Sequence, residues 1–161
     1  MGSSSVIIEG ASSGWEYQGA NATINAGTST IDFINQLSTS FKDFEGDNNQ
    51  QYHSVLFSNP NPGEAEVEGP FQVEKMVFMS SGEIKGNNSF DTLIFSAGNN
   101  YVLQANNTQT VLVHFSASAP PCQGLINLES SSAGYQADIN IQGTVALDNL
   151  SIKDIQALGN I

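Results

Sequence analysis

The stretch Phe90-Asp91-Thr92-Leu93-Ile94-Phe95 carries apolar side chains at its first, fourth and sixth positions. The same frame begins again at Tyr52, at Val73 and at Leu147, so the steps between copies are 21, 17 and 57 residues. The longest step is close to three times 19 and leaves room for two weaker copies. Self-similarity at about 20 residues is typical of β-solenoids and related arrays. We therefore expect repeated strands that stack around one shared core.

The repeat is clearest between residues 66 and 99. A shift of 17 residues pairs apolar with apolar and glycine with glycine: Val67 with Ile84, Gly69 with Gly86, Val73 with Phe90, Met76 with Leu93 and Phe78 with Phe95. Each unit predicts a strand, a turn marked by glycine, a second strand and a turn of small residues. One unit cannot bury its apolar face alone, whereas stacked units share a core with alternate side chains pointing inward.

These patterns predict an all-β fold, because helix signals are nearly absent and short alternating strands follow one another along the chain. We expect a right-handed parallel β-helix, or solenoid, since a repeat of about 17–22 residues suits one turn of such an array. The alternative is an antiparallel β-sandwich. A sandwich would favour hairpins with Asn-Gly or Asp-Gly turns, and the sequence contains neither dipeptide.

The chain has 161 residues, and we expect one domain over residues 6–161. We interpret residues 1–5 as a leader added for expression or as the tail of a preceding segment, because they lack the apolar core of a signal peptide. The strongest local break, residues 59–63, is interpreted as a long turn inside the domain, since the frame continues on both sides. Pro120 and Pro121 should lie at a corner or edge. The apolar end of the chain has no polar cap, and we expect a fragment of a longer protein.

The charge balance excludes two classes of partner. Sixteen acidic residues stand against four lysines, and the formal net charge is -12. Such a surface repels phosphate backbones and anionic lipid, so we expect neither nucleic-acid binding nor membrane-surface binding. No apolar run approaches the length of a membrane span. Cys122 is the only cysteine, which excludes an internal disulfide.

Five segments of the chain together resemble one known kind of repeat, and they cover residues 89–98, 101–105, 108–111, 126–131 and 145–154. They are similar to the repeats of very large cell-surface proteins of Bacteroidetes, the gliding-motility adhesins among them. The resemblance covers about residues 27–157, which is most of the chain. Glu129 stands where those repeats usually have arginine, so any role of that basic position is missing here.

The resemblance implies export by the type IX secretion system and an extracellular location on the bacterial cell surface. It implies right-handed β-helix or β-sandwich repeats in a non-enzymatic protein of cell adhesion and gliding motility. The expected partners are the neighbouring repeats of the same polypeptide and a polysaccharide or an abiotic surface. A purely structural stalk that binds nothing is the plainer alternative.

Two aromatic residues are candidates for ligand binding. Trp15 and Tyr17 lie at alternate positions of one expected strand and would offer stacking faces to sugars. The alternative, which we favour, is that both rings pack against the core or its end.

Three carboxylates are candidates for a metal site. Asp43, Glu45 and Asp47 alternate before an Asn-rich turn and would offer oxygen ligands to Ca²⁺. An EF-hand would not place glycine at position 46, and no suitable glutamate follows. We favour a solvated acidic loop, and we expect no cofactor other than this Ca²⁺.

Asp91-Thr92-Leu93 resembles the O-glycosylation acceptor of Bacteroidetes, in which Thr92 would carry the glycan and point outward. His53 and His114 are the only histidines, and we expect both on the surface, His114 outward because Val113 and Phe115 would face inward.

An enzyme is the alternative from another class of function. Glu64, Glu66, Glu68 and Glu83 would supply the paired carboxylates of a carbohydrate-active β-helix enzyme. That role needs a cleft, and the pattern indicates none. We therefore expect no catalytic residues.

Overall fold

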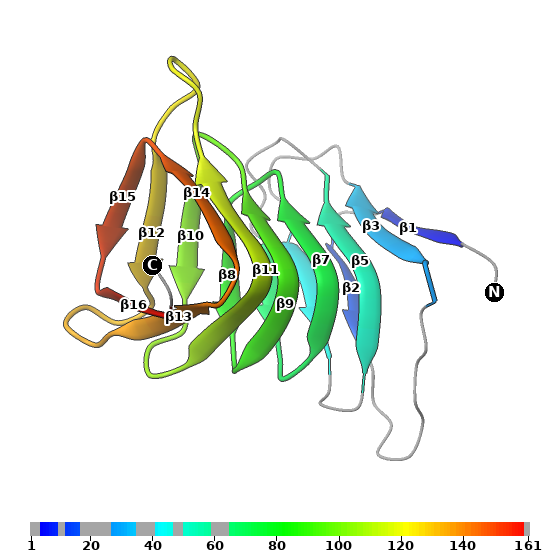
Figure 1. Ribbon diagram of the computed structural model, residues 1–161. Coiled ribbons are helices and arrows are strands. Elements are labelled where there is room, and N and C mark those ends of the chain that lie inside the picture. Colours follow the sequence, from blue (N-terminus) through cyan, green and yellow to red (C-terminus); the bar gives the residue numbers. More distant parts are fainter. Residues whose placement is uncertain are drawn as a thin grey trace.

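The computed structural model describes residues 4–9, 12–16, 27–34, 41–46, 50–58 and 65–159. In this part of the chain the structure is all-β, and its strands, β1 to β16, form two sheets (Figure 1). None of the described residues is helical, so none of them forms a helix that could cross a membrane.

The strands alternate between the sheets. Sheet A holds β1 (Ser5–Glu9), β3 (Thr30–Ile34), β5 (Gln51–Phe57), β7 (Gln72–Phe78), β9 (Asn88–Phe95), β11 (Thr108–Ser118), β13 (Ala137–Ile141), β14 (Thr144–Asp148) and β16 (Ile155–Gly159). Sheet B holds β2 (Ser12–Glu16), β4 (Phe41–Glu45), β6 (Ala65–Glu68), β8 (Gly82–Lys85), β10 (Asn100–Leu103), β12 (Ile126–Ser130) and β15 (Leu150–Lys153). One strand of sheet A and the strand of sheet B that follows it are called a rung below.

Every strand pair in the described residues is parallel. Along most of sheet A each odd-numbered strand pairs with the next odd-numbered one, and along sheet B the even-numbered strands up to β12 do the same. Near the C-terminal end the long strand β11 pairs with β13 through its first half and with β14 through its second. An antiparallel sandwich would instead join neighbouring strands by hairpins, so the sandwich alternative is wrong.

The repeated apolar frame forms the inner face of sheet A. Its first positions make one row across the strands, its fourth positions a second row and its sixth positions a third. The rows are Tyr52, Val73, Phe90 and Val111; then Val55, Met76, Leu93 and Phe115; then Phe57, Phe78, Phe95 and Ala117. All twelve residues are at most 2% exposed. The copies of the frame at Tyr52, Val73 and Phe90 are therefore confirmed as stacked strands.

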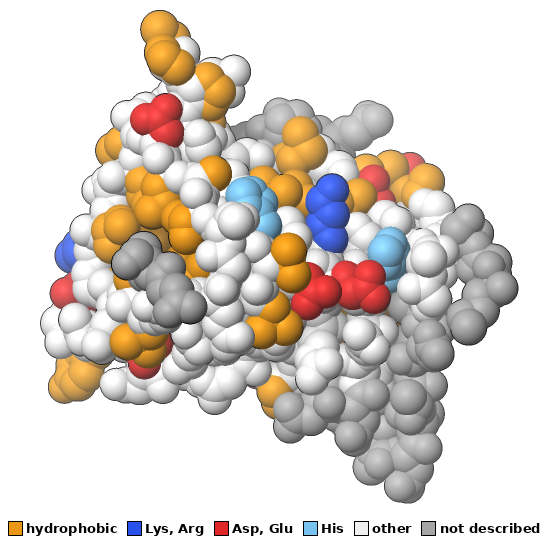
Figure 2. Space-filling view, viewed as in Figure 1, with side chains coloured by type: hydrophobic (Ala, Val, Ile, Leu, Met, Phe, Trp, Pro, Cys, Tyr) orange, Lys and Arg blue, Asp and Glu red, His pale blue; other side chains and the backbone are white. Residues whose placement is uncertain are grey.

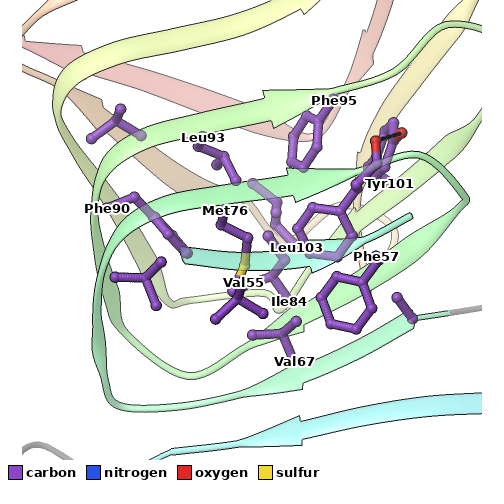
Figure 3. Packing of buried hydrophobic residues seen from close by; sticks show 14 of the residues in the cluster. Val55, Phe57, Val67, Met76, Ile84, Phe90, Leu93, Phe95, Tyr101 and Leu103 are labelled. Carbon is purple, nitrogen blue, oxygen red and sulfur yellow. Dashed lines mark hydrogen bonds between the residues drawn. The ribbon is translucent and has the colours of Figure 1, made fainter. Parts of the chain in front are cut away.

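Aromatic rings continue from rung to rung inside the molecule. Phe33 stacks on Phe57 at 4.8 Å between ring centroids, and Phe57 stacks on Phe78 at 4.9 Å. These distances match the spacing of about 4.8 Å between neighbouring strands, so side chains of one type can stack along a sheet without gaps. Figure 3 shows the inner residues of both sheets, such as Met76 and Ile84, filling the space between them.

Two expectations about the chain after Phe95 are wrong. The frame copy at Leu147 is split, because Leu147 belongs to β14 in sheet A whereas Leu150 begins β15 in sheet B. The chain turns between them at Asn149, whose φ is 52°. Val113 does not face inward but is 56% exposed. The pairing of β11 with β9 shifts register between Val111 and His114, and this bulge turns Val113 outward.

A buried polar contact closes the corner after β8. Asn88 donates from Nδ2 to the Lys85 carbonyl and to Gln109 Oε1, both at 2.9 Å, and Gln109 donates to the Gly86 carbonyl at 2.8 Å. Asn88 is 4% exposed and Gln109 is fully buried. A Cβ atom at Gly69 would lie 1.6 Å from Asn88 Oδ1, so a larger residue at this position would have to displace the Asn88 amide.

The breaks in the sequence fall between strands. Pro120 and Pro121 lie between β11 and β12, outside the ladders as predicted, and both are exposed. Residues 59–63 lie outside the described residues, and β5 before them and β6 after them join the same two sheets as the remaining strands.

Candidate functional site

The outer face of sheet B carries two columns of acidic residues. The register places Asp43, Glu66 and Glu83 side by side on β4, β6 and β8. The next column along the same strands is Glu45, Glu68 and Lys85. Neighbouring members of a column lie on adjacent strands, whose backbones are about 4.8 Å apart, so like charges repel unless a cation or water screens them. We call this surface the acidic columns.

Lys85 partly neutralises the acidic columns. Its Nζ lies 2.6 Å from Glu66 Oε1. Partial burial of the ammonium lowers the Lys85 pKa, but the hydrogen bond to Glu66 and the charges of Glu66, Glu83 and Glu68 outweigh this and leave the pKa above its ordinary value. Lys85 therefore stays charged at neutral pH and holds Glu66 in an ion pair.

The glutamates proposed for catalysis are only partly assembled. Glu66 and Glu83 are direct neighbours, Glu68 lies in the other column, and Glu64 is outside the described residues. Hydrolysis of a glycosidic bond needs two carboxylates on opposite sides of the substrate. Glu66 and Glu83 lie side by side on one sheet face instead.

A pocket lies at the other end of the same face. It has a volume of about 290 Å³ and is lined by Asn100, Asn127, Leu128, Glu129, Ser151 and Lys153. The register explains how these residues meet: Asn100 of β10 pairs with Asn127 of β12, and Asn127 pairs with Ser151 of β15. We call this site the amide pocket.

Two contacts order the side chains of the amide pocket. Asn127 Nδ2 donates to Asn100 Oδ1 at 2.7 Å. Glu129 Oε2 lies 3.7 Å from Lys153 Nζ, with both side chains about half exposed. The pocket therefore combines amides, a hydroxyl and a balanced ion pair.

The amide pocket was not among the sites predicted from the sequence. The only available signal was the polar-apolar-polar alternation in Asn127-Leu128-Glu129 and Ser151-Ile152-Lys153. Alternation predicts that the polar side chains face outward, but it does not say which strands are neighbours. Asn100 and Asn127 pair at a step of 27 residues, which differs from the steps of 17 and 21 found earlier in the chain.

The outer face of sheet A gathers charged and histidine side chains over its central strands (Figure 2). His53 Nδ1 on β5 lies 2.6 Å from Glu74 Oε2 on β7. Asp91 follows on β9, and Lys75, Thr92 and His114 occupy the adjoining column. His114 Nδ1 lies 2.8 Å from Thr144 Oγ1. The expectation that both histidines lie outside the core is confirmed, since each is partly exposed.

The pair of His53 and Glu74 can hold the imidazole in one tautomer, as a carboxylate does in a proton-transfer site. Side-chain exposures of 35% for His53 and 42% for Glu74 leave the pair in contact with solvent. In the described ranges no three or more His, Cys, Asp or Glu residues gather closely enough to hold a metal ion.

The structure places two of the other predicted site residues. Trp15 is half-buried against the core, and its indole nitrogen donates to the Tyr52 hydroxyl at 3.4 Å. Thr92 lies outside the inner rows on β9 and is half-buried, next to Lys75 and His114. Tyr17 lies outside the described residues. Sugar stacking and glycosylation at these positions stay predictions.

The predicted Ca²⁺ ligands are also divided. Asp43 and Glu45 are half-buried at alternate positions of β4 and belong to the acidic columns. The interpretation as a solvated acidic loop is therefore wrong for these two residues, because both pair within a parallel sheet. Asp47 lies outside the described residues, so the three-ligand arrangement stays a prediction.

Comparison of the chain with models of protein families, with curated proteins and with solved structures finds no match. A proposal about function therefore rests on the side chains of the two outer sheet faces and on the sequence.

Proposed function

We propose that this chain is a right-handed parallel β-helix module of a large cell-surface adhesin. The module extends the protein and offers its outer faces to a polysaccharide or another surface. The observation that carries the proposal is the continuous parallel register of both sheets, in which each rung repeats the one before it.

The alternation of the strands between the two sheets supports the β-helix. A chain that adds one strand to sheet A, crosses to sheet B and returns to pair in parallel with its previous strand winds about a single axis. Connections between parallel strands of one sheet are right-handed in about 98% of cases, because the strand twist favours that hand. A right-handed coil is therefore the proposed path.

An attachment role suits the two outer faces. Strands spaced by about 4.8 Å repeat polar side chains along the module, and a regular array of this kind matches the repeated units of a polymer. The location on the bacterial surface, the type IX route and the neighbouring repeats as partners enter the proposal through the sequence resemblance alone.

Retention of the purified chain on a panel of immobilised polysaccharides tests the proposal, with new reducing ends assayed in the same samples. We expect retention without cleavage on at least one neutral polysaccharide, and no retention on the uncoated matrix. Passage through every polysaccharide column would overturn the attachment role and leave a structural stalk.

The second candidate, a carbohydrate-active enzyme, would have to use Glu66 and Glu83, which the register makes direct neighbours on one sheet face and does not place on opposite sides of a substrate. Cleavage in the same assay, abolished by Glu83→Gln, would replace the adhesin proposal with this one. The Glu66 ion pair with Lys85 argues for the adhesin, since it occupies one of the two carboxylates.

A further inference from the structure

The geometry points to the amide pocket as a binding site for a neutral, hydroxyl-rich sugar unit. This inference rests on the proposed attachment function and names the place and the class of ligand. It uses neither the acidic columns nor the aromatic residues predicted from the sequence.

Three adjacent strands place the polar groups of the amide pocket. Asn100, Asn127 and Ser151 lie in one row across β10, β12 and β15. Glu129 and Lys153 lie two residues further along, on the same outer face of β12 and β15. Rigid strands position these groups more firmly than loops would, and a pocket of about 290 Å³ is roughly the lower size of small-molecule sites.

The amides of the pocket keep hydrogen-bonding capacity for a ligand. An Asn amide has two N–H donors and one acceptor oxygen. The bond from Asn127 Nδ2 to Asn100 Oδ1 orients both amides. In the described part of the chain no protein group bonds to Asn100 Nδ2, Asn127 Oδ1 or the Ser151 hydroxyl. Neighbouring hydroxyls of a sugar both donate and accept, so they complement an amide N–H beside an amide oxygen.

Charge favours a neutral ligand in the amide pocket. The ion pair of Glu129 and Lys153 leaves the pocket without net charge, whereas the whole chain carries -12. An anionic sugar would be repelled by the field of the molecule, and a cation would be drawn to the acidic columns instead. A neutral sugar experiences neither effect.

The test measures binding of neutral and uronic-acid oligosaccharides to the whole chain by NMR titration and by calorimetry. We expect neutral oligosaccharides to shift the side-chain amide signals of Asn100 and Asn127 in the wild-type chain. Asn127→Ala should weaken the affinity about tenfold, because it removes a direct contact and releases the Asn100 amide.

The matched control is Gln156→Ala, which removes an exposed amide from β16 in sheet A at the same end of the stack. We expect it to bind like the wild type, and both variants to keep the wild-type circular dichroism spectrum. The NMR shifts need no variant, so they decide the question even if Asn127→Ala disturbs the fold.

Three outcomes would overturn the inference. Retention on polysaccharide with unchanged Asn100 and Asn127 signals would leave the attachment function standing and place the ligand elsewhere. Tighter binding of uronic-acid oligosaccharides at the amide pocket would reject the ligand class. Absence of any retention or binding would remove the attachment function itself and the inference with it.

Discussion

At the scale of single residues, the Asn88 side-chain amide is tightly confined beside Gly69. The Asn88 amide is held by two hydrogen bonds and is 4% exposed, and its Oδ1 has no hydrogen-bond partner in the described residues. Oδ1 faces the place where a Cβ of residue 69 would stand. Neither group can move without breaking a neighbouring hydrogen bond.

Gly69→Ala should therefore destabilise the chain by about 1–3 kcal/mol, as overpacking of an interior does. Urea unfolding measures the change in the free energy of unfolding. Gly14→Ala is the control, because its Cβ would make ordinary contacts of 3.4 Å and should leave stability unchanged within ~1 kcal/mol. The loss should shrink in the background of Asn88→Ala; an equal loss in both backgrounds would contradict the assigned contact.

Tyr101 links the stability of the chain to alkaline pH. It is 1% exposed, and its hydroxyl accepts a hydrogen bond from the Ser96 N–H. The single hydroxyl hydrogen is shared between the carbonyls of Ser96 at 3.1 Å and Phe78 at 3.3 Å. Burial raises the Tyr101 pKa to about 12, above its ordinary value of 10, whereas bonds from Ser96 and Asn99 lower it by less. Stability from this group is present below pH 10 and is lost as the pH rises toward 12.

We expect the free energy of unfolding to fall by about 2–3 kcal/mol between pH 10 and pH 12 through Tyr101. Tyr101→Phe should remove this part of the pH dependence, and it should cost about 1 kcal/mol at pH 7 through the lost hydrogen bonds. The control is Tyr135→Phe, since Tyr135 is 60% exposed. Urea unfolding at several pH values gives the comparison; an unchanged alkaline slope in Tyr101→Phe would refute the assignment.

At the scale of elements, each strand of sheet A depends on its neighbours through the inner rows. Met76 on β7 lies between Val55 on β5 and Leu93 on β9, and it is fully buried. Met79 directly follows β7 and is 44% exposed. Two methionines of one segment therefore differ mainly in burial.

Met76→Ala should destabilise the chain by about 2–5 kcal/mol, because it leaves a cavity between three strands. The matched variant Met79→Ala should change stability by less than ~1 kcal/mol. Urea unfolding midpoints compare the two. Similar losses at both positions would mean that the inner rows do not carry the stability of sheet A.

At the scale of the whole molecule, negative charge opposes the folded state. The net charge is -12, and the register concentrates part of it in the acidic columns. Stacking brings these carboxylates closer together than they are in the unfolded chain. Salt shortens the range of their repulsion from about 30 Å at 0.01 M to about 3 Å at 1 M.

Raising NaCl from about 0.01 M to about 0.5 M at pH 7 should stabilise the chain by ~1 kcal/mol, which corresponds to about 2–4 °C in Tm. Thermal unfolding followed by circular dichroism measures the shift. A Tm that falls with salt would indicate that ion pairs such as Lys85 with Glu66 outweigh the repulsion.

The inner face of the fold could be predicted from the sequence alone. Apolar spacing identified the strands at Tyr52, Val73 and Phe90, because a strand buried on one face must repeat apolar residues at fixed positions. The same local rule failed at Leu147. Its spacing is equally compatible with a continuous strand and with two strands separated by a turn at Asn149.

The neighbours of each outer residue, in contrast, depend on how the rungs stack. His53 meets Glu74 after 21 residues, and Asn100 meets Asn127 after 27, because the turns between strands differ in length. Turn lengths follow no regular pattern in the sequence. They nevertheless determine which residues of successive strands lie side by side. The core could be predicted from the sequence, because burial requires apolar residues at fixed positions within each strand. The candidate site could not be predicted, because its residues lie on different strands that become neighbours only when the strands stack.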